Sequence, residues 1–284
     1  MTISSGKFIW YDQMSNDLPG SEKFYSEVVG WSLAANTMND QAYTLLAVGK
    51  TMVGGLMPIP ADAAKSGARP TWMGYISVDN VDTYARKVTA AGGTIFRDPT
   101  DIPNVGRFAV VGDPHGAGFI LFRPNGEPPP GGPPAPGTPG TIGWHELQAG
   151  DLNRAFVFYS GLFGWTKSDA IDMGPMGTYQ IFNIDDVQAG GMMTKTPQTP
   201  RPFWLYYINV EAIDAAAARA RKAGGKICNG PLEVPGGQWI VQCLDPQGAM
   251  FAMVAPQPEP IYYCATGEEM PAFLPALAGY HCLA

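Results

Sequence analysis

The 284-residue sequence is poor in basic residues. It has 18 lysines and arginines against 25 aspartates and glutamates, which gives a formal net charge of −7 at pH 7. Nucleic-acid binding depends on clustered lysines and arginines that neutralise phosphates, and here the basic residues are scattered along the chain. We therefore expect no nucleic-acid partner.

Long hydrophobic runs are absent as well. The hydrophobic fraction of 45% is ordinary for a globular protein, but no apolar stretch approaches the ~20 residues of a membrane-spanning helix. The N-terminal residues show no charged segment followed by an apolar core, so we expect no secretory signal. The sequence predicts a cytoplasmic protein without a membrane partner.

Cysteine and histidine are also scarce. The four cysteines, Cys228, Cys243, Cys264 and Cys282, form no Cys-x-x-Cys pair, and the chain has only three histidines. This pattern does not match a zinc site, and we expect buried or unreactive thiols in a reducing cytoplasm. Dinucleotide-binding, phosphate-loop and Gly-x-Ser-x-Gly motifs are missing.

What the sequence does contain is an internal repeat. Residues 9–31 and 143–165 both have the pattern of a strand, a helix with an aromatic face and a final Gly-Trp. Asp17 and Asp151 occupy matching positions before the two helices, and aspartate is a favoured helix N-cap. The same unit has therefore been used twice.

The later part of each half is repeated too. The strand pattern at 72–78 recurs at 204–210, and each is followed by an amphipathic helix that ends at a double glycine. Asp113-Pro-His-Gly-Ala117 then matches Asp245-Pro-Gln-Gly-Ala249, a typical turn motif. Each half is thus predicted to consist of strand–helix–strands units.

These repeats divide the chain into four parts. We assign a first module to residues 1–123 and a second to 142–257. The proline- and glycine-rich segment 124–141 has the composition of an extended linker. The segment 258–284 is a C-terminal tail without a counterpart in the first half, and its aromatic and leucine residues favour packing.

The repeated motifs resemble those of the vicinal oxygen chelate superfamily, which includes glyoxalase I, bleomycin-resistance proteins and extradiol dioxygenases. The resemblance covers nearly everything except the linker and the tail. It implies an α+β fold of tandem paired βαβββ modules, with two cup-shaped mixed sheets and flanking helices. It says less about activity, because one fold hosts many chemistries.

The metal enzymes of this superfamily hold a divalent ion that chelates two neighbouring substrate oxygens. The resemblance places the ligand positions at Tyr11, Met73, Ile120, His145, Leu205 and Ala252. Only His145 is a good donor, whereas a catalytic metal needs about three protein ligands. We therefore expect no cofactor, with a single divalent metal left open as the alternative.

His145 and Glu146 are the candidate catalytic residues. By the resemblance, His145 faces the cup, where it would line a ligand cavity; a hydrogen-bonded core histidine is the alternative. Glu146 matches Asp12 in the first half, and an acid on an otherwise apolar strand is costly to bury unless it is paired. Each acid is either hydrogen-bonded in the core or, if it faces the cup, a general base with a raised pKa.

Five further residues are candidates for ligand binding. Tyr11, Gln13, Tyr75 and Tyr207 share the strand parity of the implied ligand positions and would line the cups. Such a cavity suits an aromatic or oxygen-rich small molecule, although the same aromatics could simply fill the core. Arg107 could meet an anionic group, or it could be solvated.

Together these observations predict a protein that binds a small-molecule ligand in a metal-poor cup, similar to the bleomycin-resistance branch. The alternative is a metal-dependent lyase or isomerase related to lactoylglutathione lyase, which leaves open whether the protein is an enzyme. An extradiol dioxygenase would need iron ligands that Leu205 and Ala252 do not supply. Because one chain contains both halves of a cup, a monomer suffices, and a homodimer is the alternative.

Overall fold

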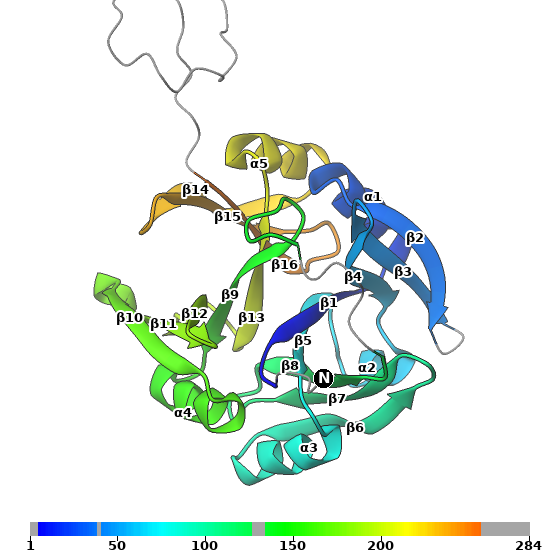
Figure 1. Cartoon of the computed structure of the whole chain (residues 1–284). Helices are drawn as coiled ribbons and strands as arrows, with labels where there is room; N and C mark the ends of the chain where they lie inside the picture. The colour runs from blue at the N-terminus through cyan, green and yellow to red at the C-terminus, as the bar shows by residue number, and fades with distance from the viewer. Residues whose placement is uncertain (1–4, 39–40, 127–133, 257–284) are drawn as a thin grey trace, which may run out of the picture.

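The computed structural model describes residues 5–38, 41–126 and 134–256 (Figure 1). This part of the chain forms two mixed sheets of eight strands each, and none of its helices is long and apolar enough to cross a membrane. The predicted tail, together with residues 127–133 of the predicted linker, lies outside the described residues.

The first sheet is built by the N-terminal half of the chain. Its elements are β1 (Phe8–Ser15), α1 (Leu18–Val28), β2 (Ser32–Met38), β3 (Gln41–Val48), β4 (Thr51–Pro58), α2 (Ala61–Lys65), β5 (Thr71–Ser77), α3 (Val81–Ala90), β6 (Thr94–Ile102), β7 (Gly106–Gly112) and β8 (Gly118–Pro124).

The second sheet repeats this order. Its elements are β9 (Ile142–Ala149), α4 (Leu152–Phe163), β10 (Thr166–Asp172), the short 3₁₀ helix η1 (Gly174–Met176), β11 (Thr178–Ile184), β12 (Val187–Thr194), β13 (Phe203–Asn209), α5 (Ile213–Lys222), β14 (Lys226–Val234), β15 (Gln238–Leu244) and β16 (Met250–Ala255).

Each sheet joins two βαβββ units through their first strands. The strand order is β2-β3-β4-β1-β5-β8-β7-β6 in the first sheet and β10-β11-β12-β9-β13-β16-β15-β14 in the second. Strand β1 runs antiparallel to β5 and parallel to β4, and β9 relates to β13 and β12 in the same way. The predicted α+β fold of tandem paired βαβββ modules is confirmed.

The helices begin and end as the sequence indicates. The Asp17 carboxylate accepts from the Gly20 backbone N–H at 3.1 Å, and the Asp151 carboxylate accepts from that of Arg154 at 2.8 Å. Helix α4 stops at Gly164, whose φ of 72° suits a residue without a Cβ. These caps place the aromatic faces of α1 and α4 toward the core.

The two sheets pack back to back. Their inner faces and the helices share one large apolar core, which we call the module junction, and there α1 contacts α5 and α3 contacts α4. In Figure 1 the central strands of the two sheets lie next to each other, and the outer strands curve away. The outward faces, which we call the first and second cup, each carry a separate small apolar cluster.

The repeated Gly-Trp motif ties the two modules together. The Trp31 indole N–H donates to the carbonyl of Gly140, just before β9, at 2.8 Å. The Trp165 indole N–H donates to the carbonyl of Gly6, just before β1, also at 2.8 Å. Each tryptophan therefore holds the start of the other module.

Candidate functional site

The first cup contains a buried acid between two tyrosines. The Tyr43 hydroxyl donates to Asp12 Oδ1 at 2.6 Å, and the Tyr75 hydroxyl donates to Oδ2 at 2.5 Å. The Trp10 indole N–H also donates to Oδ1, at 2.9 Å. Asp12 is only 1% exposed, so its carboxylate is held by three side-chain donors rather than by water.

The second cup contains the equivalent cluster around Glu146, which is 6% exposed. The hydroxyls of Tyr207 and Tyr179 donate to Oε2 at 2.9 and 3.3 Å. The Gln148 amide donates to Oε1 at 2.7 Å, and the Trp144 indole donates to the Tyr179 hydroxyl at 2.8 Å. We call these two groups the acid–tyrosine clusters.

Burial sets the electrostatics of both clusters. It raises the pKa of Asp12 and of Glu146, and the hydrogen bonds that each carboxylate accepts partly oppose this shift. Burial, together with the neighbouring carboxylate, also raises the pKa of Tyr75 and of Tyr207. Phenol donors thus surround a carboxyl group whose pKa lies above its ordinary value, an arrangement suited to binding polar groups and to exchanging a proton.

Paired glycines make room for one tyrosine of each cluster. A Cβ added at Gly55 would lie 2.0 Å from the Tyr43 hydroxyl oxygen, and one at Gly191 would lie 2.1 Å from a ring carbon of Tyr179. Tyr43 and Tyr179 were not among the site residues predicted from the sequence. The signal was present, because these tyrosines occupy matching places in the two halves, ahead of the repeated Gly-Gly pairs.

We expect Gly191→Ala to displace the Tyr179 ring and to lower the free energy of unfolding by about 1–3 kcal/mol, the usual cost of overpacking. Urea denaturation measures this change. Gly161→Ala is the matched control, because a Cβ there meets no atom within 4 Å and alanine favours a helix over glycine by about 1 kcal/mol. Equal stability of the two variants would contradict the role given to Gly191.

The predicted placement of His145, Tyr11 and Gln13 in the cups is wrong. Neighbouring residues of a strand point to opposite faces, and since Asp12 and Glu146 face the cups, these three face the module junction. The other implied metal-ligand positions, Met73, Ile120, Leu205 and Ala252, do face the cups. The error was one of strand parity, because a shift of one residue reverses the face.

At the junction His145 is a hydrogen-bonded core residue. Its Nδ1 lies 2.7 Å from the Ala189 carbonyl oxygen, and its Nε2 lies 2.6 Å from the Tyr11 hydroxyl oxygen. A carbonyl only accepts, so Nδ1 carries the proton and Nε2 accepts from Tyr11. The Phe8 ring stacks on the imidazole, and burial lowers the His145 pKa to about 4.

Gln13 and Arg107 are also engaged away from the cups. The Gln13 amide is fully buried and donates to the Asp245 carboxylate of the other module at 3.3 Å. The Arg107 guanidinium forms two hydrogen bonds to Asp82 at 2.8 and 2.9 Å and a third to Asp101 at 3.0 Å. Of the predicted ligand-binding residues, only Tyr75 and Tyr207 lie in the cups, with Glu146 beside Tyr207.

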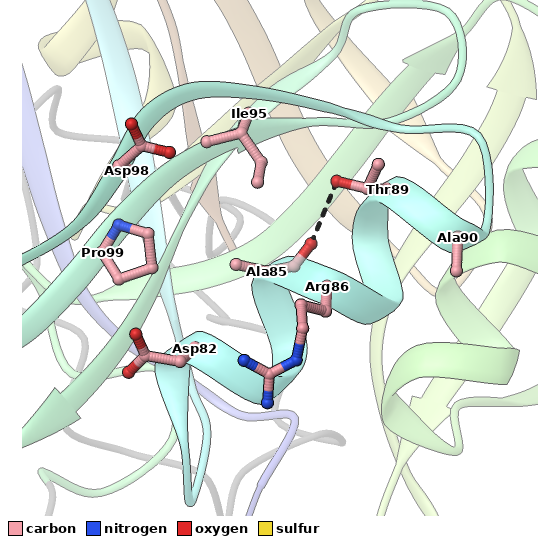
Figure 2. Close-up of a pocket in the computed structure, with 8 residues that line it drawn as sticks. All are labelled: Asp82, Ala85, Arg86, Thr89, Ala90, Ile95, Asp98 and Pro99. Carbon is pink, nitrogen blue, oxygen red and sulfur yellow. Dashed lines mark hydrogen bonds between the residues drawn. The ribbon is translucent and has the colours of Figure 1, made fainter.

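A surface groove of about 510 Å³ lies near Arg107 but is separate from both cups. It runs between α3 and β6, and Figure 2 shows Ala85, Ile95 and Pro99 between these elements. The nearby Asp82 carboxylate is occupied by Arg107. The polar groups of the groove do not converge on one point, as they do in the acid–tyrosine clusters.

The residues of the cups do not fit a divalent metal. Within the described ranges, no group of three or more histidine, cysteine, aspartate or glutamate side chains could hold a metal ion. Each cup offers one carboxylate, and both of its oxygens already accept hydrogen bonds. The surrounding positions that the family resemblance implied, such as Leu205 and Ala252, are apolar.

Comparison with known proteins agrees with this architecture. The family model described as Glyoxalase/Bleomycin resistance protein/Dioxygenase superfamily matches residues 7–121 and 141–253. The chain is 30% identical over 252 residues to "Putative glyoxylase CFP32" of Mycobacterium tuberculosis, covering 88% of this chain and 95% of that protein. It is 30% identical over 266 residues to "Anthracycline biosynthesis protein DauV" of Streptomyces sp. strain C5, covering 89% and 94%.

Solved structures share the fold at low sequence identity. The Mn(II)-bound glyoxalase from Novosphingobium aromaticivorans superposes with a TM-score of 0.58 at 15% identity, covering 94% of this chain and 84% of that one. The 2,2',3-trihydroxybiphenyl 1,2-dioxygenase from Sphingomonas wittichii strain RW1 gives 0.61 at 13% identity, covering 89% and 90%. With two matched modules, the chain belongs to the Glyoxalase/Bleomycin resistance protein/Dioxygenase superfamily.

Proposed function

We propose that this protein binds a small aromatic, oxygen-rich molecule in an outward-facing cup and needs no metal to do so. The observation that carries the proposal is the acid–tyrosine cluster, which combines a carboxylate acceptor with two phenols. The adjoining indole, Trp10 or Trp144, adds an apolar face for stacking. Concave sites of this kind, mostly apolar with a few converging polar groups, are typical of small-molecule binding.

The relatives support this class of ligand. DauV and the related DnrV are named for anthracycline biosynthesis, and anthracyclines are flat fused-ring compounds that carry hydroxyl and carbonyl groups. Such a molecule offers rings for stacking on the indole and oxygens for the phenols and the carboxylate. The ligand of this chain is then a planar aromatic of comparable polarity.

Titration of the full-length chain with 1,4-dihydroxyanthraquinone tests the proposal. We expect saturable quenching of tryptophan fluorescence, with the same Kd before and after dialysis against EDTA. Metal analysis of protein purified without chelator should give well under one ion per chain. Binding that EDTA abolishes and Mn²⁺ restores would contradict the metal-free proposal.

The second candidate is a metal-dependent lyase or isomerase related to lactoylglutathione lyase, with Glu146 as the general base. It is favoured by the relatives named glyoxylase and by the raised pKa of Glu146. It requires about one tightly bound ion per chain and formation of lactoylglutathione from methylglyoxal and glutathione. Absence of both would leave the binding proposal as the only one of the two.

A further inference from the structure

The two cups share the acid–tyrosine cluster but differ in the residues around it. The strand register identifies the matching positions, because Tyr75 pairs with Ile120 in the first sheet and Tyr207 pairs with Ala252 in the second. The differing pairs, first cup before second, are Met14 and Gln148, Thr71 and Phe203, Met73 and Leu205, Phe108 and Ile240, Val110 and Gln242, Gly118 and Met250, Ile120 and Ala252, and Phe122 and Val254.

Large apolar side chains fill the first cup. Met73, Phe108, Ile120 and Phe122 are each less than 10% exposed and pack together. The Phe122 ring meets the Tyr75 ring edge-on at 5.5 Å between centroids. These apolar side chains share the face of the sheet with the first acid–tyrosine cluster, and Asp12 itself is only 1% exposed.

The second cup has smaller side chains at two positions beside its tyrosine, and larger ones at two others, where Phe203 and Met250 replace Thr71 and Gly118. Ala252 and Val254 stand where the first cup has isoleucine and phenylalanine. Tyr179 is half-buried, whereas Tyr43, its counterpart in the first cup, is only 3% exposed. The second carboxylate is also the more exposed of the two, with Glu146 at 6% and Asp12 at 1%, so the second acid–tyrosine cluster is the more accessible one.

Two glutamines extend the second cluster. Gln148 donates through Nε2 to the Glu146 carboxylate, and Gln242 donates through Nε2 to the Tyr207 hydroxyl at 2.7 Å. Both glutamines are half-buried. The first cup has Met14 and Val110 at these positions and thus no amide groups.

The amides leave hydrogen-bonding capacity for a ligand. A carboxamide has two N–H donors and one carbonyl acceptor, and in the described part of the chain the Gln148 carbonyl oxygen accepts no hydrogen bond. Gln242 donates one N–H to the Tyr207 hydroxyl and accepts through its carbonyl from the Asn229 amide at 3.4 Å, which leaves its second N–H for a ligand. A ligand that donates one hydrogen bond and accepts another would match this pair.

We propose that the ligand occupies the second cup alone, and that Gln148 and Gln242 select an aromatic ring carrying both a hydroxyl and a carbonyl group, as in hydroxylated aromatic ketones and quinones. This inference rests on the proposed function. The ligand hydroxyl donates to the Gln148 carbonyl oxygen, and the ligand carbonyl accepts from the Gln242 amide. Trp144 lies against the ring.

Calorimetric titration of the full chain tests where the ligand binds. Wild type should bind one 1,4-dihydroxyanthraquinone per chain. Ala252→Ile with Val254→Phe, which copies the packing of the first cup, should weaken binding at least 100-fold. The mirror-image control, Ile120→Ala with Phe122→Val, should leave the Kd within twofold, and thermal melts establish that both variants are folded.

The role of the glutamines is tested by comparing that probe with anthraquinone, which lacks hydroxyl groups. Wild type should prefer the hydroxylated probe by 10- to 100-fold, and Gln148→Met with Gln242→Val should reduce this ratio to about one. An unchanged ratio would overturn the selection by Gln148 and Gln242.

The outcomes separate the two proposals. No binding of the hydroxylated probe by wild type would contradict the proposed function itself. Two bound molecules per chain, or weaker binding in the first-cup control, would overturn the assignment to the second cup while leaving the proposed function standing.

Discussion

Replacing Asp245 by alanine is expected to lower the free energy of unfolding by about 3 kcal/mol, which corresponds to a fall in Tm of about 6–12 °C. The Asp245 carboxylate is 4% exposed and accepts from the Gln247 and Ala249 backbone N–H groups at 3.0 and 2.8 Å. Its other oxygen accepts from the Tyr25 hydroxyl of the first module at 2.9 Å. Alanine would leave these buried donors without an acceptor. Thermal and urea denaturation measure the loss.

Two further variants separate the turn from the module junction. Tyr25→Phe removes the Tyr25–Asp245 bond between modules, together with the bond that Tyr25 accepts from the Trp72 indole N–H within its own module. A double-mutant cycle with Asp245→Asn isolates the first of these and should give a coupling of about 1 kcal/mol. Asp151→Ala, which removes a half-buried helix cap, should cost only about 1 kcal/mol. A loss at Asp245 no greater than the loss at Asp151 would contradict a docking role for the Asp-Pro-x-Gly turn.

The fold could be predicted because its determinants are local. Strand alternation, the capping aspartates and the glycine stops act within a few residues, and their repetition identified two modules of the same kind. The junction could not be predicted in this way. The local sequence indicates a helix end at Trp31 and Trp165 and a turn at Asp245. The polar groups of these residues form hydrogen bonds with the other module. Nothing in a local pattern states which distant segment will supply the partner.

The site was predicted only in part, for a reason specific to strands. Glu146 was recognised as costly to bury unpaired, and its partners Tyr179 and Tyr207 show how that cost is met. His145, one residue earlier, was favoured as the cup residue because imidazole is the better metal ligand. Face assignment on a strand depends on an exact count, so one residue separates a cup residue from a core residue.

Among the residues that the structure describes, the cups lack metal ligands and are still polar, because the strand alternation turns Asp12 and Glu146 toward them. An inward acid whose oxygens are bonded to phenols has its charge stabilised without a cation. Tyr43 and Tyr75 donate these hydrogen bonds to Asp12 and partly oppose the effect of burial on its pKa. In the first module the cluster lies among apolar side chains. In the second module the same cluster is joined by two glutamine amides.

His145 should make the stability of the protein depend on pH. Burial lowers its pKa from 6.5 to about 4. Between these values the unfolded chain binds a proton that the folded protein does not, so stability falls as the pH falls. The contribution of His145 is fully present above about pH 6.5 and decreases by about 3 kcal/mol by pH 4. Urea denaturation at half-unit pH intervals measures it.

His145→Gln removes this titration while supplying an amide that, like the imidazole, can donate and accept hydrogen bonds. The difference in unfolding free energy between wild type and variant should therefore change by about 3 kcal/mol between pH 7 and pH 4. Taking the difference cancels the opposite trend from Asp12 and Glu146, whose raised pKa values favour the folded state at lower pH. Tyr11→Phe should retain the pH dependence, because burial rather than the Tyr11 hydroxyl lowers the His145 pKa. A difference that stays constant from pH 7 to pH 4 would mean that His145 is protonated as readily in the folded protein as in the unfolded chain, and that the junction admits water.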